Sequence, residues 1–198
     1  KIKKVLFSSS GGTVYGNKKK FPIKETFKVN PISNYGINKL KCENDLINSN
    51  NEKFYILRIS NVYGPLQFYN SNIGIVSKLI ESTVNKKKLV IWGDGNIIRD
   101  YIYIDDLTLL IEKVIEEDLD NGIYNISSGK GTTINEIITK VSNITKNECK
   151  IEYVKSREFD VLKNILCNKK IRKQIKWAPK TSLESGIKKM YNEYINLH

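Results

Sequence analysis

Segments of strand character alternate with segments of helical periodicity along this 198-residue chain. Residues 2–8 and 54–59 are short apolar runs that predict buried strands. Residues 33–49 and 73–85 predict helices, and in the first of these Ile37, Leu40 and Leu46 are expected on one side. This alternation is typical of a parallel sheet covered by helices, so the sequence predicts an α/β fold.

Capping signals mark several of the later helix starts. Residues 101–104 predict a strand that runs into a helix, and Asp105 and Asp106 are expected to cap that helix. The segment Thr-Ile-Asn-Glu at residues 133–136 has the form of a capping box. Ser182 is expected to cap the last helix, just after a packed turn at Trp-Ala-Pro.

Composition narrows the classes of protein that the chain can belong to. The net charge of +12 comes almost entirely from lysines that lack interleaved aromatic residues, which argues against a nucleic-acid partner. Cys42, Cys149 and Cys167 lack metal spacing and predict reduced thiols in a cytoplasmic protein. The only histidine is His198, so no metal site is expected, and no apolar run is long enough to predict a membrane partner.

Tyr35 and Lys39 stand four residues apart and therefore share one face of the predicted helix at 33–49. A phenol normally ionises near pH ~10, and a neighbouring ammonium group lowers that pKa by stabilising the phenolate. A hydroxyl from the serine-rich segment at 8–10 could relay the substrate proton. The alternative for this spacing alone is a surface tyrosine beside a solvated lysine.

The order of motifs resembles that of the extended short-chain dehydrogenase/reductase superfamily, in its NAD-dependent nucleotide-sugar epimerase/dehydratase branch, of which UDP-glucose 4-epimerase is typical. The likeness runs from residue 2 to about residue 195. The motifs that carry it lie at residues 8–16, 35–39, 57–65, 90–95, 99–106, 124–126, 157–161 and 177–179.

The resemblance implies an enzyme that uses NAD to epimerise a UDP-hexose at C4 through a transient 4-keto sugar. Tyr35 would be the acid/base, and Lys39 would lower the pKa of Tyr35 and hold the nicotinamide ribose. The position of the relay hydroxyl falls on Gly11, which leaves Ser10 and Thr13 as equal candidates for that role. The family also implies a homodimer.

The resemblance further implies six substrate-binding residues. Arg99 and Arg157 would hold the diphosphate, and guanidinium forks suit that role better than lysine does. Asp160 would accept from a ribose hydroxyl, Asn61 would reach the phosphate or sugar, and Val90 and Trp92 would border the uracil. The structural alternatives are an Arg99 paired with Asp100 or Glu81, an Asp160 that caps a turn, and a Trp92 in the core.

The motif order also predicts the domain organisation. Residues 1–64 would be the remainder of a Rossmann-type NAD-binding domain, and residues 65–198 a small mixed α/β substrate-binding domain, with 100–128 packing back on the sheet. The Gly-rich phosphate turn expected after the first strand of such a domain is absent from this sequence. We therefore expect the chain to be the C-terminal two-thirds of an enzyme, inactive by itself.

Other reactions of the branch remain open from the sequence. A nucleotide-sugar reductase, decarboxylase or dehydratase is the alternative enzyme, and a non-catalytic nucleotide-sugar-binding fragment is the alternative of another class. The related 4,6-dehydratases carry an Asp-Glu pair after the relay threonine, where this chain has Gly12 and Thr13. That difference favours an epimerase over a dehydratase.

Overall fold

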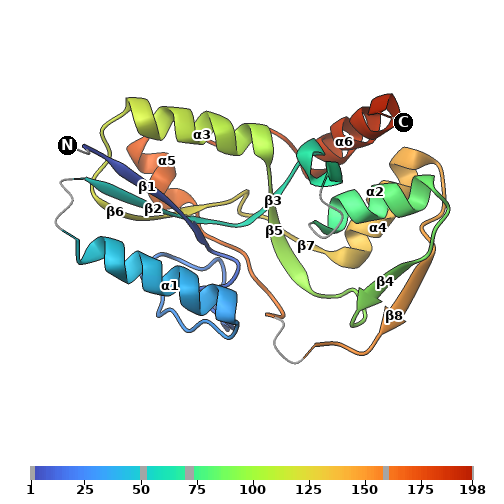
Figure 1. The fold of residues 1–198 in the computed structure, drawn as a ribbon, viewed down its shortest axis with the longest axis horizontal. Coiled ribbons are helices and arrows are strands. Elements are labelled where there is room, and N and C mark those ends of the chain that lie inside the picture. The colour runs from blue at the N-terminus through green and yellow to red at the C-terminus, as the bar shows by residue number, and fades with distance from the viewer. Residues whose placement is uncertain (1–2, 50–52, 70–73, 158–160, 198) are drawn as a thin grey trace.

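The computed structural model describes residues 3–49, 53–69, 74–157 and 161–197. Strands and helices alternate as an α/β fold, as predicted (Figure 1). The strands are β1 (Val5–Ser10), β2 (Phe54–Ile59), β3 (Asn61–Tyr63), β4 (Leu89–Trp92), β5 (Ile98–Tyr103), β6 (Gly122–Ile126), β7 (Gly131–Thr133) and β8 (Ile151–Val154). The helices are α1 (Asn34–Ile47), α2 (Ile75–Val84), α3 (Ile104–Glu116), α4 (Ile134–Thr145), α5 (Lys169–Gln174) and α6 (Leu183–Leu197), with a 3₁₀ helix at Pro65–Tyr69.

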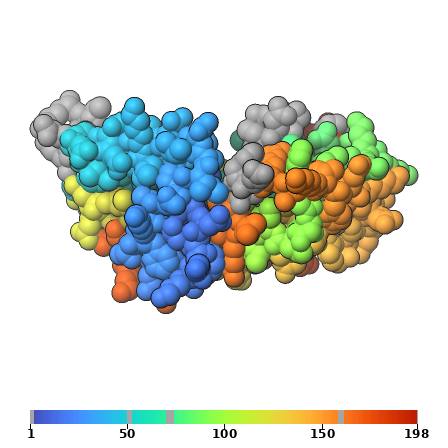
Figure 2. All heavy atoms as spheres, turned by 90° about the horizontal axis from the view of Figure 1, so that it is seen from below, coloured from blue at the N-terminus to red at the C-terminus, as the bar shows by residue number. Residues whose placement is uncertain are grey.

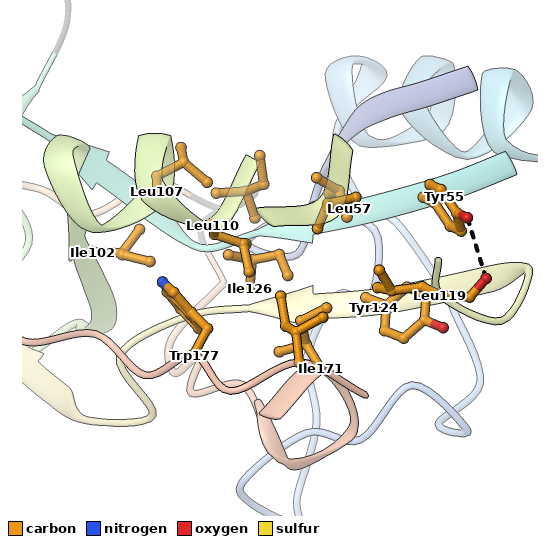
Figure 3. Close-up of a cluster of buried hydrophobic side chains, with 13 residues drawn as sticks. Tyr55, Leu57, Ile102, Leu107, Leu110, Leu119, Tyr124, Ile126, Ile171 and Trp177 are labelled. Atoms are coloured by element: carbon orange, nitrogen blue, oxygen red, sulfur yellow. Dashed lines mark hydrogen bonds between the residues drawn. The ribbon is translucent and has the colours of Figure 1, made fainter. Parts of the chain in front are cut away.

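The first sheet has the order β1-β2-β6, and both pairs of neighbours are parallel. Figure 1 shows α3 on one side of this sheet and α1 on the other. Successive side chains of β2 point to opposite faces of the sheet. Because a helix covers each face, both sets of side chains are buried. Tyr55 and Leu57 lie with α3 in one apolar core (Figure 3), to which Ile59 also belongs. Arg58 contacts Glu43 of α1 instead.

The apolar core on the α3 side also includes residues from the C-terminal third of the chain. Ile171 of α5 and Trp177 pack there against Ile126 of β6 (Figure 3). The Trp177 indole donates a 3.0 Å hydrogen bond from Nε1 to the carbonyl oxygen of Asp106. The turn after α5 is thereby tied to the start of α3.

A second half of the molecule is built around α2, α4 and α6. Their apolar faces share a second core, which includes Leu79, Val141 and Met190. β5 pairs in parallel with β3, which directly follows β2, and antiparallel with β7, which directly precedes α4. β5 therefore joins the two halves. β4 and β8 form a separate parallel ribbon. The assignment of residues 1–64 and 65–198 to two domains stays a prediction.

The capping predictions have mixed outcomes. Thr133 and Glu136 form the predicted capping box at α4, and Ser182 Oγ accepts from the Ser185 amide at the start of α6. Asp105 and Asp106 lie in the first turn of α3, but the N-cap residue is Tyr103, so their predicted capping role is wrong. Asp106 is buried and accepts instead from the amides of Lys180 and Thr181, while Asp105 pairs with Lys189.

The helix at α1 departs from its predicted amphipathic pattern. Ile37 is 50% exposed, and the two buried residues of the helix are Gly36 and Glu43. Leu40 and Leu46 are half-buried, so Ile37 is the one of the three predicted apolar residues that departs from the pattern. Across the described ranges, no helix combines the length and the apolar character that a membrane crossing requires.

Candidate active site

The carboxyl ends of β1 and β2 converge at one edge of the first sheet, which is where ligands bind in open α/β sheets. β1 ends at Ser10, and β2 is followed directly by Ser60 and Asn61. A methyl group added to Gly12 would lie 3.9 Å from both Ser10 Oγ and Asn61 Oδ1. Two of the predicted site residues, one from each strand end, therefore face the same small space.

Tyr35 and Lys39 lie in the first turns of α1, which begins at the N-cap Ser33. Lys39 donates a 2.7 Å hydrogen bond from Nζ to the carbonyl oxygen of Ser8, near the end of β1. The Lys39 ammonium lies 5.7 Å from the centre of the Tyr35 ring, and Tyr35 is 57% exposed. The pair thus shares one face of α1, and the phenol is accessible to a ligand.

The glycines at 11 and 12 have different surroundings. A methyl group at Gly11 would lie 2.4 Å from Leu166 Cδ1 and 2.9 Å from the carbonyl oxygen of Arg58, so no side chain fits there without movement. Thr13 packs against Gly36 of α1, and its hydroxyl lies 3.5 Å from the Ser10 carbonyl. Ser10 and Thr13 therefore remain the two candidates for the relay.

The second half of the molecule contains a pocket of about 590 Å³ between β4, β5 and the first turn of α2. Five of the six predicted substrate-binding residues line it, namely Asn61, Val90, Trp92, Arg99 and Arg157. These residues come from four separate segments of the chain, and only the fold brings them together. Asp160 lies outside the described residues.

Positive groups dominate this pocket. Arg99, Arg157 and Lys78 line it, and the described lining residues include no carboxylate. The α2 N-terminus also faces the pocket at Gly74 and Ile75, and the N-cap residue Gly74 has no side chain with which to cap the first amides. Because the first amides of a helix lack intrahelical partners and the helix dipole is positive there, the pocket favours an anionic group.

An apolar wall completes the pocket on the β4 side. Val90 and Trp92 are each 46% exposed, whereas Ile91 between them is buried, so the strand turns one apolar face outward. The Arg157 guanidinium lies 4.5 Å from the centre of the Trp92 ring. The alternative of a core Trp92 is therefore wrong, and an exposed apolar wall beside cations is typical of a binding surface.

A smaller hollow of about 470 Å³ adjoins this pocket at Ile97 and Arg157. Asn17 of the N-terminal half lines it on one side, and Gly93 and Asp94 line it on the other. Figure 2 shows the blue residues that follow β1 and the green and orange residues of the second half as two lobes that meet at a notch. The pocket thus lies beside the junction of the two halves.

Asp100, one of the alternative partners considered for Arg99, is engaged elsewhere. Its carboxylate accepts from the amides of Ser128, Gly129 and Leu166 and from the Ser128 hydroxyl, at 2.7–3.2 Å. Burial raises the pKa of Asp100 to about 6, although these four hydrogen bonds act to lower it. Asp100 therefore ties β5 to the segments around 128 and 166.

Sequence reasoning missed three lining residues that the fold supplies. Gln67 projects from the 3₁₀ helix and donates from Nε2 to the Val62 carbonyl, while its Oε1 atom is buried without a partner among the described residues. Lys78 is one lysine among many, and Tyr101 is one of 11 tyrosines. No spacing signal in the sequence distinguishes them. The described ranges bring no three histidine, cysteine or acidic side chains together in a metal-binding group.

Comparisons with known proteins agree with this architecture. The model of the NAD dependent epimerase/dehydratase family matches residues 1–127. The chain is 30% identical to UDP-glucose 4-epimerase of Mycolicibacterium smegmatis, covering 98% of this chain and 63% of the relative. It is 31% identical to dTDP-4-dehydro-6-deoxyglucose reductase of Escherichia coli, covering 94% of this chain and 60% of the relative.

A solved structure shows the same arrangement. The crystal structure of UDP-glucose 4-epimerase from Thermotoga maritima with UDP-glucose is 37% identical and superposes with a TM-score of 0.92, covering 99% of this chain and 64% of that one. The chain thus spans somewhat less than two thirds of the length of these relatives. On the family match and this similarity, the chain belongs to the NAD-dependent epimerase/dehydratase family.

Proposed function

We propose that the complete protein carrying this chain is an NAD-dependent nucleotide-sugar epimerase that acts on a UDP-hexose at C4. The observation that carries the proposal is the pocket in which five predicted binding residues meet, with three cations and an apolar wall. A nucleotide sugar offers matching chemistry, because it joins a flat base to a diphosphate and a polar sugar. The catalytic pair on α1 stands at the neighbouring strand edge.

The chain's own groups fit the roles that such a reaction needs. When bound, NAD supplies a reversible hydride acceptor. Tyr35 would take the proton from the sugar hydroxyl, and its exposed phenol leaves that position open to a ligand. Lys39 would stabilise the phenolate and hold the nicotinamide ribose. Ser10 or Thr13 would relay the proton, and the close contacts around Gly11 leave no room for a hydroxyl there.

The diphosphate would lie among the cations of the pocket. Arg99 and Arg157 reach it from different segments, so their guanidinium groups can hold separate oxygen atoms. The amides at the start of α2 and the ammonium of Lys78 add further positive potential. Trp92 and Val90 would contact the base. The ribose contact of Asp160 stays a prediction from the sequence.

The reductase among the relatives supports a second candidate function, reduction of a 4-keto nucleotide sugar. A reductase and an epimerase share the Tyr–Lys pair, but only the epimerase returns the hydride to its substrate. A dehydratase is less favoured, because Gly12 and Thr13 occupy the positions of its acidic pair. A fragment that binds nucleotide sugars without turnover is the remaining alternative.

The deciding experiment incubates the complete protein with UDP-glucose and NAD, and follows the 4-epimer by chromatography and the reduced cofactor by absorbance. We expect the 4-epimer to form until equilibrium with no net gain of reduced cofactor. A reductase would instead consume reduced cofactor in proportion to a 4-keto substrate. Binding of UDP without turnover of any UDP-hexose would leave only the non-catalytic alternative.

Location and assembly are part of the same proposal. The cysteines Cys42, Cys149 and Cys167 are all free thiols, which supports a reducing compartment such as the cytoplasm. The apolar side chains of Ile37 and Ile47 are exposed on α1, and a homodimer would give them a partner surface.

A further inference from the structure

α1 carries the Tyr35–Lys39 pair, and no apolar side chain of this helix is fully buried, although Leu40 and Leu46 are half-buried. Its two buried residues are Gly36, directly after Tyr35, and Glu43, four residues after Lys39. At Gly36 the helix approaches Thr13 so closely that an added methyl group would lie 3.1 Å from its carbonyl oxygen. The second contact is a buried carboxylate.

Glu43 lies one helical turn beyond Lys39 and is fully buried. The Arg58 guanidinium of β2 holds both of its oxygens, with Nε 3.0 Å from Oε1 and Nη2 2.6 Å from Oε2. Ser9 of β1 also donates its hydroxyl to Glu43 Oε1. One carboxylate therefore joins the helix to two neighbouring strands.

The strand side of this contact is itself fixed. The Arg58 guanidinium lies 4.8 Å from the centre of the Tyr15 ring, and the Tyr15 hydroxyl donates to Asn125 Oδ1 at 2.7 Å. Asn125 is opposite Arg58 in the register of β2 and β6, and its amide donates to the Ile23 carbonyl. Arg58 is therefore held by contacts that do not depend on α1.

A buried ion pair of this kind is a poor source of stability, because removing two charges from water offsets most of their attraction. Apolar residues of similar size would hold a helix on a sheet at least as firmly. Apolar packing is non-directional, however, whereas a bidentate ion pair fixes both the rotation of the helix about its axis and its position along the sheet. The unusual choice of contact thus favours a role in placing the helix.

The geometry points to Glu43 and Arg58 as positioning residues that set Tyr35 and Lys39 against the hydroxyls at the end of β1. Rotation or sliding of α1 would move Lys39 Nζ from the Ser8 carbonyl, only 2.7 Å away, and would carry Tyr35 with it. This inference rests on the proposed function for its catalytic consequence. The placement itself can be measured on the chain alone.

The test replaces the pair by apolar residues, Glu43→Leu with Arg58→Met, so that no unpaired charge stays buried. We expect this double variant to keep most of its thermal stability. We also expect kcat of the complete protein to fall roughly 100-fold while KM changes less than about threefold, because misplacement of about 1 Å costs this much. If the double variant does not fold, Ser9→Ala serves as the test variant instead. It removes one donor only and should lower kcat several-fold.

A second readout does not depend on turnover. The Lys39 ammonium lies 5.0 Å from the Phe7 ring and 5.7 Å from the Tyr35 ring, so NOE cross-peaks from the Lys39 ε-methylene to both rings are expected. These cross-peaks should weaken in both test variants. Asp106→Asn is the matched control, a buried carboxylate outside α1 whose loss should lower stability but leave kcat and the cross-peaks unchanged.

Unchanged cross-peaks in folded test variants would overturn the inference, as would a kcat that changes only in proportion to stability. Should the wild-type complete protein convert no UDP-hexose, the proposed function fails, and the cross-peaks alone decide whether the ion pair places the helix.

Discussion

Alanine substitutions at the two adjacent glycines should have opposite effects on stability. At Gly11 the new methyl group would lie 2.4 Å from the fully buried Leu166 and 2.9 Å from a backbone oxygen of β2. At Gly12 its closest contacts would be at 3.9 Å, an ordinary van der Waals distance. Overpacking of the first kind costs ~1–3 kcal/mol.

Both substitutions reduce the entropy of the unfolded chain by a similar amount, worth ~0.4–1 kcal/mol, so the difference between the variants isolates the clash. At ~2–4 °C per kcal/mol for a chain of this size, Gly11→Ala should melt about 6 °C below Gly12→Ala. Differential scanning calorimetry on the chain measures this directly. Equal melting temperatures, or a lower one for Gly12→Ala, would refute the reasoning and reopen position 11 to a hydroxyl-bearing side chain.

The remaining predictions concern the site and one buried acid. Tyr35→Phe in the complete protein should lower epimerisation by ~10²–10⁴-fold without changing the melting temperature, and retention of a tenth of the activity would exclude Tyr35 as the base. Arg99→Lys and Arg157→Lys should each weaken UDP binding by ~10–100-fold in calorimetry, since an ammonium cannot reproduce the fork; unchanged affinity with reduced stability would make both arginines structural. The raised pKa of Asp100, about 6 against an ordinary 3.8, means that its stability contribution is complete below pH 3.8 and is lost as pH rises through 6. Urea unfolding should show the wild type losing about 2 kcal/mol relative to Asp100→Asn between pH 4 and 7, and a constant difference would contradict the shift.

Much of the fold could be predicted because the local signals agree with the tertiary structure. β2 spans residues 54–59, as its apolar run predicts, and the capping box at Thr133 starts α4. The chemistry of α1 was less accessible to sequence reasoning. Its apolar periodicity predicts Ile37, Leu40 and Leu46 on one side, and the two leucines are half-buried. The periodicity gives no sign of the fully buried Glu43, whose partner Arg58 lies on β2.

The candidate site likewise contains residues that the sequence predicts and residues that it does not. Motif order predicted Asn61, Trp92 and Arg157, and the fold brings these residues into one pocket. Gln67 and Lys78 could not be predicted, because their positions depend on how the 3₁₀ helix and α2 pack rather than on any local pattern. The proton relay stays a prediction for the same reason, since the choice between Ser10 and Thr13 depends on the position of a bound sugar.

The β4–β8 ribbon limits how this part of the chain can change in length. Its parallel register sets Trp92 opposite Val154, and the chain then continues for three residues to bring Arg157 over the indole ring. Side chains alternate between faces, so a single-residue insertion within β4 would turn the indole toward the core and Ile91 toward the outer face. Insertions and deletions should therefore be tolerated in the connections before β4 and β8, and lengths within the two strands should stay fixed.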